Sequence, residues 1–275
     1  MRKLIAAFIL ITALLAGNAF EIAAQNANPG PKISYPAAPL QTDFDDGVEK
    51  LPPFFTGNNG AAVFDALKRR EKVLARGNSE TDESFNGRVE AYDKKGLTGS
   101  VKIDSTLAFV LPSDEKTWSV AIRSDRGVAT LHVRLNPEAN IAELGRKAPH
   151  KTFSIFRKKI DERDYATANE FGGRMVVSDT ISESVSISAE NWNRNKWGGI
   201  KIELPGNNRQ FAKDHARVMF IGKLGVPYVS TAYSVGVATN AEPRESLESR
   251  GYIYLVVSEV WVFNEETGEI YGKIK

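Results

Sequence analysis

Residues 191–199 contain the residue types that recognition of a small polar ligand requires. Two tryptophans, Trp192 and Trp197, flank Arg194, and asparagines alternate between them. Indole rings stack on sugar or peptide groups, while guanidinium and amide groups supply hydrogen bonds. The sequence therefore predicts a ligand-binding loop at Trp192, Arg194 and Trp197. One alternative stays open, a hairpin loop whose tryptophans fold onto a sheet.

Glu259 is a carboxylate within an otherwise apolar strand. Simple alternation predicts that it shares a face with Ile253, Leu255, Val257, Trp261 and Phe263. Burial without a cation raises the pKa of a carboxyl group, which is one way to make a general acid. A structural ion pair with Arg or Lys, or exposure near the strand end, gives the same pattern. We expect structural pairing and keep a carboxylate-dependent hydrolase, with Glu259 as its acid, as the alternative.

Two serine motifs lack the surroundings that nucleophilic catalysis requires. Ser234 lies in an Ala-x-Ser-x-Gly sequence, but its flanks alternate as one strand and the last histidine, His215, precedes it. Ser113 and Lys116 match Ser-x-x-Lys, but a strand is expected to follow them and no Lys-Thr-Gly sequence exists. A strand and a hairpin turn explain these motifs better than a hydrolase.

Metal and cofactor chemistry has little support in the composition. The chain has no cysteine, which excludes thiolate metal sites, thiol redox chemistry and cysteine nucleophiles. The three histidines, His132, His150 and His215, are too far apart in sequence for a paired metal site. Residues 43–47 resemble a calcium loop only in part, and no glycine-rich phosphate loop is present. We predict neither a metal nor a cofactor.

The elements that must position these residues are mostly strands. Residues 252–263 form an almost wholly apolar run rich in β-branched and aromatic side chains. Residues 264–268 then form a turn that ends in glycine, so 270–274 are predicted to return as a hairpin. A strand that is apolar on both faces belongs in the middle of a covered sheet. Further apolar or alternating runs predict strands at 101–103, 107–111, 118–122, 129–135, 153–156, 175–187, 200–204, 218–224 and 229–237.

Two helices are predicted before the strands. Residues 60–76 carry an apolar stripe at helical spacing, and Gly77 follows as a stop. Ser79 or Thr81 begins the second helix, which Gly96 ends. Helices first and many strands afterwards predict an α+β fold. We expect an N-terminal helical pair followed by a mostly antiparallel β-sheet or sandwich closed by a C-terminal hairpin.

The N-terminus predicts export. A short basic start, a largely apolar run at 4–15 and small residues afterwards are typical of a secretory signal. Cleavage after Ala19 or after Ala24 fits, and an uncleaved membrane anchor is the alternative. We assign 1–24 to a signal peptide, 25–57 to a flexible tether that holds six of the twelve prolines, and 58–275 to a single α+β domain.

The net charge of the mature chain restricts the classes of partner that we expect. Loss of Arg2 and Lys3 with the leader leaves 34 basic and 34 acidic residues, so the mature chain is close to neutral. Nucleic-acid binding requires a concentrated basic face, and we predict none. No second stretch is long and apolar enough to span a membrane, so the mature chain is expected to have no membrane span.

Three segments carry a resemblance to a family. They are an acidic–aromatic–Arg segment at 84–88, an aromatic–Asn–aromatic–Gly stretch at 165–172, and a terminal hairpin with a Thr-Gly turn at 261–268. Together they resemble a loose family of exported bacterial proteins, over residues 60–275. Glu170 departs from that pattern, since a small residue is expected before Phe171. The resemblance implies an export pathway and a fold, and no activity.

Together these features predict an exported, soluble, cofactor-free domain that is secreted or periplasmic after signal cleavage. A binding or structural interaction module is favoured over an enzyme. Its partner would be an extracytoplasmic ligand or protein that the residues do not identify. The alternatives are the Glu259 hydrolase and, with an uncleaved leader, a membrane-tethered interaction module.

Overall fold

The computed structural model describes residues 38–94, 96–113, 117–125, 128–138, 151–168, 172–204 and 209–275. All of them belong to one of the two compact units of the chain, Pro36–Lys275. The predicted signal peptide and the tether residues up to 37 lie outside the described residues, as do Lys116, His150 and Glu170. Within the described ranges, no helix is both long enough and apolar enough to cross a bilayer.

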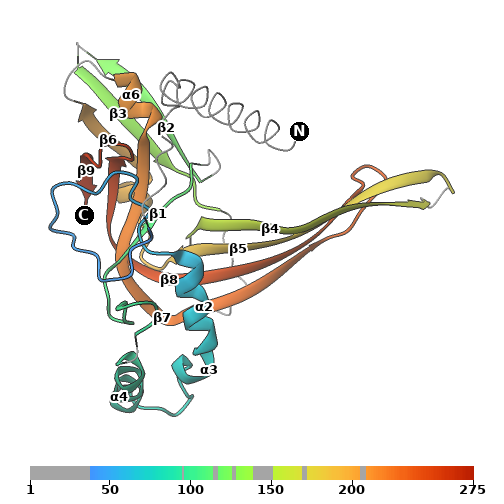
Figure 1. Cartoon of the computed structure of the whole chain (residues 1–275), viewed down its shortest axis with the longest axis horizontal. Helices are drawn as coiled ribbons and strands as arrows, with labels where there is room; N and C mark the ends of the chain where they lie inside the picture. Colours follow the sequence, from blue (N-terminus) through green and yellow to red (C-terminus); the bar gives the residue numbers. More distant parts are fainter. Residues whose placement is uncertain are drawn as a thin grey trace, which may run out of the picture. The chain divides into compact units, whose positions relative to one another are not determined.

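The protein has a sheet-rich α+β fold (Figure 1). The helices are α2 (Gly60–Arg69), α3 (Glu71–Leu74), α4 (Asp82–Asp93), α5 (Arg194–Trp197) and α6 (Arg209–Asp214). The strands are β1 (Leu107–Val110), β2 (Trp118–Asp125), β3 (Val128–Leu135), β4 (Lys151–Ala168), β5 (Arg174–Ala189), β6 (Gly199–Leu204), β7 (Ala216–Gly236), β8 (Arg244–Asn264) and β9 (Ile270–Ile274).

The strands form two sheets. The six-stranded sheet has the order β1-β7-β8-β5-β4, with β9 paired to β8, and the three-stranded sheet has the order β2-β3-β6. Pairing is antiparallel except between β5 and β8, which run parallel. Strand β8, which contains the apolar run that the sequence places in the middle of a sheet, has partners on both sides and pairs with β9 across the turn at Gly268. The parallel pair is a feature that hairpin reasoning did not predict.

The six-stranded sheet has two faces with different covers. We call the face that carries Ile187 and Ile253 the core face, and it packs against α2 and the three-stranded sheet in the main hydrophobic cluster. Gly251 lies on this face against α2, since an added Cβ would lie 2.6 Å from the ring of Phe64. The helix therefore lies directly on β8, and a larger residue at position 251 would require the Phe64 ring to move.

The opposite face carries a second apolar cluster near the C-terminal end of β8. Phe44 and Leu51 are buried against Trp261 and Phe263, and the rings of Phe44 and Trp261 meet edge to face at 5.3 Å. The backbone of Leu51 also donates to the carbonyl of Gly268 at 2.9 Å. Residues from 40 to 55, which composition assigned to the tether, thus form part of the packed unit.

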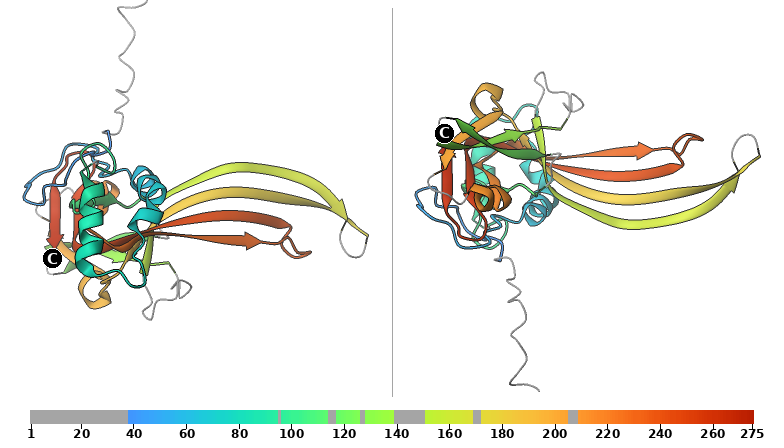
Figure 2. Two further views of the ribbon diagram at one scale, coloured as in Figure 1. Left: turned by 90° about the horizontal axis from the view of Figure 1, so that it is seen from below. Right: turned by 90° about the horizontal axis from the view of Figure 1, so that it is seen from above.

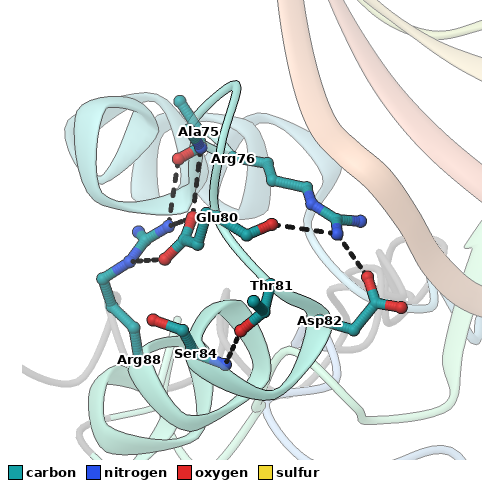
Figure 3. Close-up of polar contacts among 8 residues, drawn as sticks. Ala75, Arg76, Glu80, Thr81, Asp82, Ser84 and Arg88 are labelled. Atoms are coloured by element: carbon teal, nitrogen blue, oxygen red, sulfur yellow. Dashed lines mark hydrogen bonds and ion pairs between the residues drawn. The ribbon is translucent and has the colours of Figure 1, made fainter.

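The helical region is held by caps and one ion-pair cluster. Asn59 and Thr81 cap α2 and α4, and the predicted helix 60–76 divides at Arg70 into α2 and α3. Arg88 of α4 donates to both carboxylate oxygens of Glu80, at 3.0 and 2.6 Å, and to the carbonyl of Ala75 at 3.1 Å (Figure 3). Arg88, which belongs to the segment that carries the family resemblance, therefore joins α3 to α4.

Four strands of the large sheet continue beyond α2 and the small sheet (Figure 2). We call these outer parts the extension, residues 158–168 of β4, 174–183 of β5, 233–236 of β7 and 244–249 of β8. The remainder of the unit is called the body. Most of the exposed large apolar side chains among the described residues lie on the extension: Ile160, Tyr165, Val176, Tyr233, Val235 and Leu247.

Candidate functional site

The segment between β5 and β6 is fixed to the sheet by side-chain amides. Asn191 donates to the carbonyl of Val257 at 2.7 Å and accepts from its amide at 2.9 Å, so it continues the pairing of β8 where β5 has ended. Asn193 then caps the single turn of α5 by accepting from the amides of Asn195 and Lys196. Asn191 and Asn193 therefore hold the backbone of this loop.

The two tryptophans of the predicted ligand loop have different environments. Trp197 is 2% exposed and lies in the hydrophobic core, with the Lys196 ammonium 4.8 Å from its ring centroid. Trp192 is half-buried, and its ring packs against Phe153 at 4.9 Å and against Trp197 at 5.7 Å. The structure thus folds Trp197 onto the sheet and leaves Trp192 at the surface of the same aromatic cluster.

A cavity of about 550 Å³ opens beside Trp192 and Arg194. The end of β3 and the start of β4 supply its other walls. Its lining residues are Arg134, Leu135, Asn136, Pro137, Lys151, Trp192, Arg194 and Gly198. Three of these carry a positive charge, and none of the lining residues in the described part of the chain is acidic. Gly198 is required at this corner, because an added Cβ would lie 2.5 Å from the carbonyl oxygen of Arg194.

A second hollow of about 490 Å³ continues from the first along the three-stranded sheet and shares Arg134 and Gly198 with it. Its floor is the outer face of β2, β3 and β6, where register places Ala121, His132 and Lys201 in one row. Arg123 lies at its far end. The five cations of the two hollows, which we call the basic channel, are Arg123, Arg134, Lys151, Arg194 and Lys201.

The electrostatics of the basic channel act on His132. Partial burial and the positive charges of Arg123 and Lys201 lower the pKa of this imidazole. A histidine whose nearby charges all repel a proton lies in a positive potential. Glu203 is also on the outer face, in the row of Thr130 and Arg123, and it lines neither hollow. The surroundings of His132 therefore disfavour its protonated, charged form.

Glu259 lies outside the basic channel, and the prediction of the strand face that it shares is wrong in part. An extra residue in β8 shifts the register between Val257 and Glu259, so Ile253, Leu255 and Val257 line the core face while Glu259 faces the opposite side with Trp261. The Glu259 carboxylate accepts from the indole of Trp261 at 2.6 Å and pairs with the ammonium of Lys275 at 3.2 Å. Both carboxylate oxygens thus have partners, and Glu259 lines neither hollow of the channel.

The serine and histidine candidates are not brought together. Ser234 lies near the end of β7, whereas His215 precedes the first residue of that strand and contacts Glu266 at 3.4 Å. Residues 216–233 of β7 separate the two side chains. Within the described ranges, no group of three or more His, Cys, Asp or Glu side chains is arranged to hold a metal ion.

Arg134 and Lys151 of the first cavity, like Arg123 and Lys201 of the second hollow, are channel residues that sequence reasoning missed. A signal for Arg134 was present, because His132 and Arg134 occupy the polar positions of an alternating strand and Lys201 does so on another. The pairing of β3 with β6, which places those positions on one face, has no comparable signal. The junction of β3, β4 and the Trp192 loop depends on tertiary packing.

Comparison with known proteins adds no relative to this picture. No family model, curated protein or solved structure matches the chain.

Proposed function

We propose that this protein is an exported binding module that takes an anionic ligand in the basic channel. One observation carries the proposal: Arg134, Lys151 and Arg194 line one cavity with the ring of Trp192, and no acidic residue is among the described residues of that lining. Like charges are costly to hold together, so a lining of this kind favours a negatively charged occupant.

The size and composition of the cavity define the ligand class. A volume of about 550 Å³ falls within the range of about 300–1,000 Å³ usual for small-molecule sites. Guanidinium groups form paired hydrogen bonds with carboxylates and phosphates, and an indole presents an apolar face to a ring. The ligand is therefore a carboxylate- or phosphate-bearing molecule with a sugar or similar ring. The continuation of the channel toward Arg123 suits a longer polyanion.

The experiment compares charged and uncharged forms of one ring. The purified chain is titrated calorimetrically with glucose, glucuronate and glucose 6-phosphate, and binding by either anion but not by glucose is expected. Affinity should fall as salt concentration rises, since exposed charges are screened. Arg134→Ala combined with Arg194→Ala should weaken binding at least tenfold.

A matched control removes two charges elsewhere. Arg69 and Lys72 are exposed on α2 and α3, away from the channel, and their double alanine variant should bind like the wild-type chain. Equal affinity for glucose, or unchanged anion binding after loss of Arg134 and Arg194, would reject the proposal. A DNA oligonucleotide serves as a further probe, and binding of DNA alone would assign the channel to nucleic acid instead.

Export is part of the proposal and is supported by the N-terminal sequence. N-terminal sequencing of the mature chain should find its start after Ala19 or Ala24. An intact Met1 would favour the membrane-tethered module. The alternative hydrolase gains nothing from the position of Glu259, because its carboxylate is engaged by Trp261 and Lys275.

A further inference from the structure

The extension has two outer edges, and they differ in how they resist pairing with another strand. On the β4 side, the edge carries a dense row of charges from Lys158 to Asp164, and its register with β5 shifts between Lys159 and Asp161. Charged side chains and irregularities of this kind are the usual protection of an open edge. This edge is therefore unsuited to strand addition.

The β7 side lacks that protection. Residues 229–237 contain neither a charged residue nor a proline. Strand β1 pairs with β7 only at residues 219–222, so no described strand covers the outer side of β7 from Val229 onward. Tyr233, Val235 and Val237 are 73%, 69% and 73% exposed. A long, uncharged edge with a high strand propensity is a template for pairing.

The sequence of this edge matches itself when it is reversed. In an antiparallel pair centred on Tyr233, Val229 would face Val237 and Thr231 would face Val235. Directly paired residues project to the same face of a sheet, so these side chains would all lie on the core face. Between them, Ser230 would face Gly236 and Ala232 would face Ser234, which are small residues on the opposite face. Apart from Tyr233, which faces its own copy, each pair joins two β-branched residues or two small residues, and no pair brings two charges together.

We propose that the β7 edge binds a second copy of this chain, with residues 229–237 of the two copies paired antiparallel about a two-fold axis at Tyr233. The four strands of each extension would then form one continuous sheet. The apolar side chains Tyr233, Val235 and Leu247 of both copies would share one face of it. A two-fold axis requires a self-complementary surface, which is the property of this edge. A strand from a different protein is the competing occupant, and the test separates the two.

The absence of cysteine makes the test direct. Tyr233→Cys places a single thiol at the proposed axis, opposite its own copy, where directly opposed residues lie about 4.5–5.5 Å apart, within reach of a disulfide. Mild oxidation of the full chain should give a covalent dimer in high yield. Asp164→Cys, on the exposed β4 edge of the same extension, is the matched control and should stay monomeric.

A second experiment tests the register of the proposed pair. A mixture of Thr231→Cys and Val235→Cys chains should form a mixed dimer in preference to dimers of either variant alone. Tyr233→Lys places two positive charges at the axis, and sedimentation should show a dimer dissociation constant raised at least tenfold. The substituted side chain is largely exposed, so the circular dichroism spectrum should not change. A wild-type chain that stays monomeric at all concentrations, equal cross-linking by Asp164→Cys, or a dimer insensitive to Tyr233→Lys would overturn the proposal.

Discussion

Ile253 and Leu247 lie on the same face of the same strand, six residues apart, yet one is in the body and the other in the extension. Ile253 is fully buried beneath α2 and the small sheet, whereas Leu247 is 43% exposed. Their neighbours on the core face show the same contrast, since Ile187 is buried and Tyr233 is exposed. The alternation of a strand therefore determines which face a side chain joins, and a separate element determines whether that face is covered.

The largest expected effect is the loss of a buried side chain in the body. Ile253→Ala should lower the free energy of unfolding by about 2–5 kcal/mol, because it removes apolar contacts and leaves a cavity. Leu247→Ala should cost less than about 1 kcal/mol, since solvent already reaches that side chain. Urea unfolding of both variants measures the difference. Equal losses would mean that the core face of the extension is covered in solution.

Gly251 lies at the boundary between the body and the extension, and its substitution should have the second-largest effect on stability. Gly251→Val improves strand propensity but places atoms within 2.6 Å of the Phe64 ring, so we expect a loss of about 1–3 kcal/mol. Ser249→Val, one step outward on the same face, should change stability by no more than about 0.5 kcal/mol. Both values come from urea unfolding.

A second substitution tests the cause of the Gly251 effect. Phe64→Leu should recover part of the loss in the Gly251→Val background, because it removes the clashing ring edge. No recovery would show that the cost comes from the strand itself and not from the cover of α2.

The distinction between the face that a side chain joins and the cover over that face explains which parts of the fold were predictable from the sequence. Apolar alternation is a local property, so most strands from 107 to 274, the central position of the C-terminal run and the core face of β5 were predictable from it. The strand predicted at 101–103 was wrong, since only an isolated bridge forms at Val101. The outer parts of β4 and β8 were not predicted as strands either. The extra residue near Ser258 was not predictable, because a bulge has no signature in a run of apolar residues, and it moved Glu259 to the opposite face. Nor did local pattern show that strands β4, β5, β7 and β8 extend beyond the elements that cover them, because the residues of a strand do not show where its covering elements end.

The candidate site likewise contains residues that were predictable from local sequence and residues that were not. Trp192 and Arg194 were predictable because they are adjacent in sequence and carry the residue types of a ligand loop. Arg134 and Lys151 come to them from the ends of two other strands. A site assembled at a junction of loops requires the strand order, which residue types do not contain.

The smallest expected effect concerns ion pairs, and it compares the helical part of the body with the extension. In the body, Glu80 is 15% exposed and bound by both Arg88 and the amide of Gly77. In the extension, Asp179 is 13% exposed, but its described partner Arg163 is 68% exposed, compared with 31% for Arg88. Exposed single pairs contribute little, because solvent screens them and the long side chain loses freedom. Glu80→Gln should therefore destabilise the protein at pH 7, and Asp179→Asn should have a smaller effect or none.

The pH dependence separates a charge effect from a change of shape. The hydrogen bonds from Arg88, and then the one from Gly77, lower the pKa of the Glu80 carboxyl group. A carboxyl group with a lowered folded-state pKa contributes its full stabilisation above its unfolded pKa of about 4.3 and loses it as pH falls through the folded value. The stability difference between wild type and Glu80→Gln should thus be constant near neutral pH and shrink below about pH 4.3. Urea midpoints measured from pH 7 to pH 3 test this, and a difference that does not change with pH would show that Glu80 acts through packing alone.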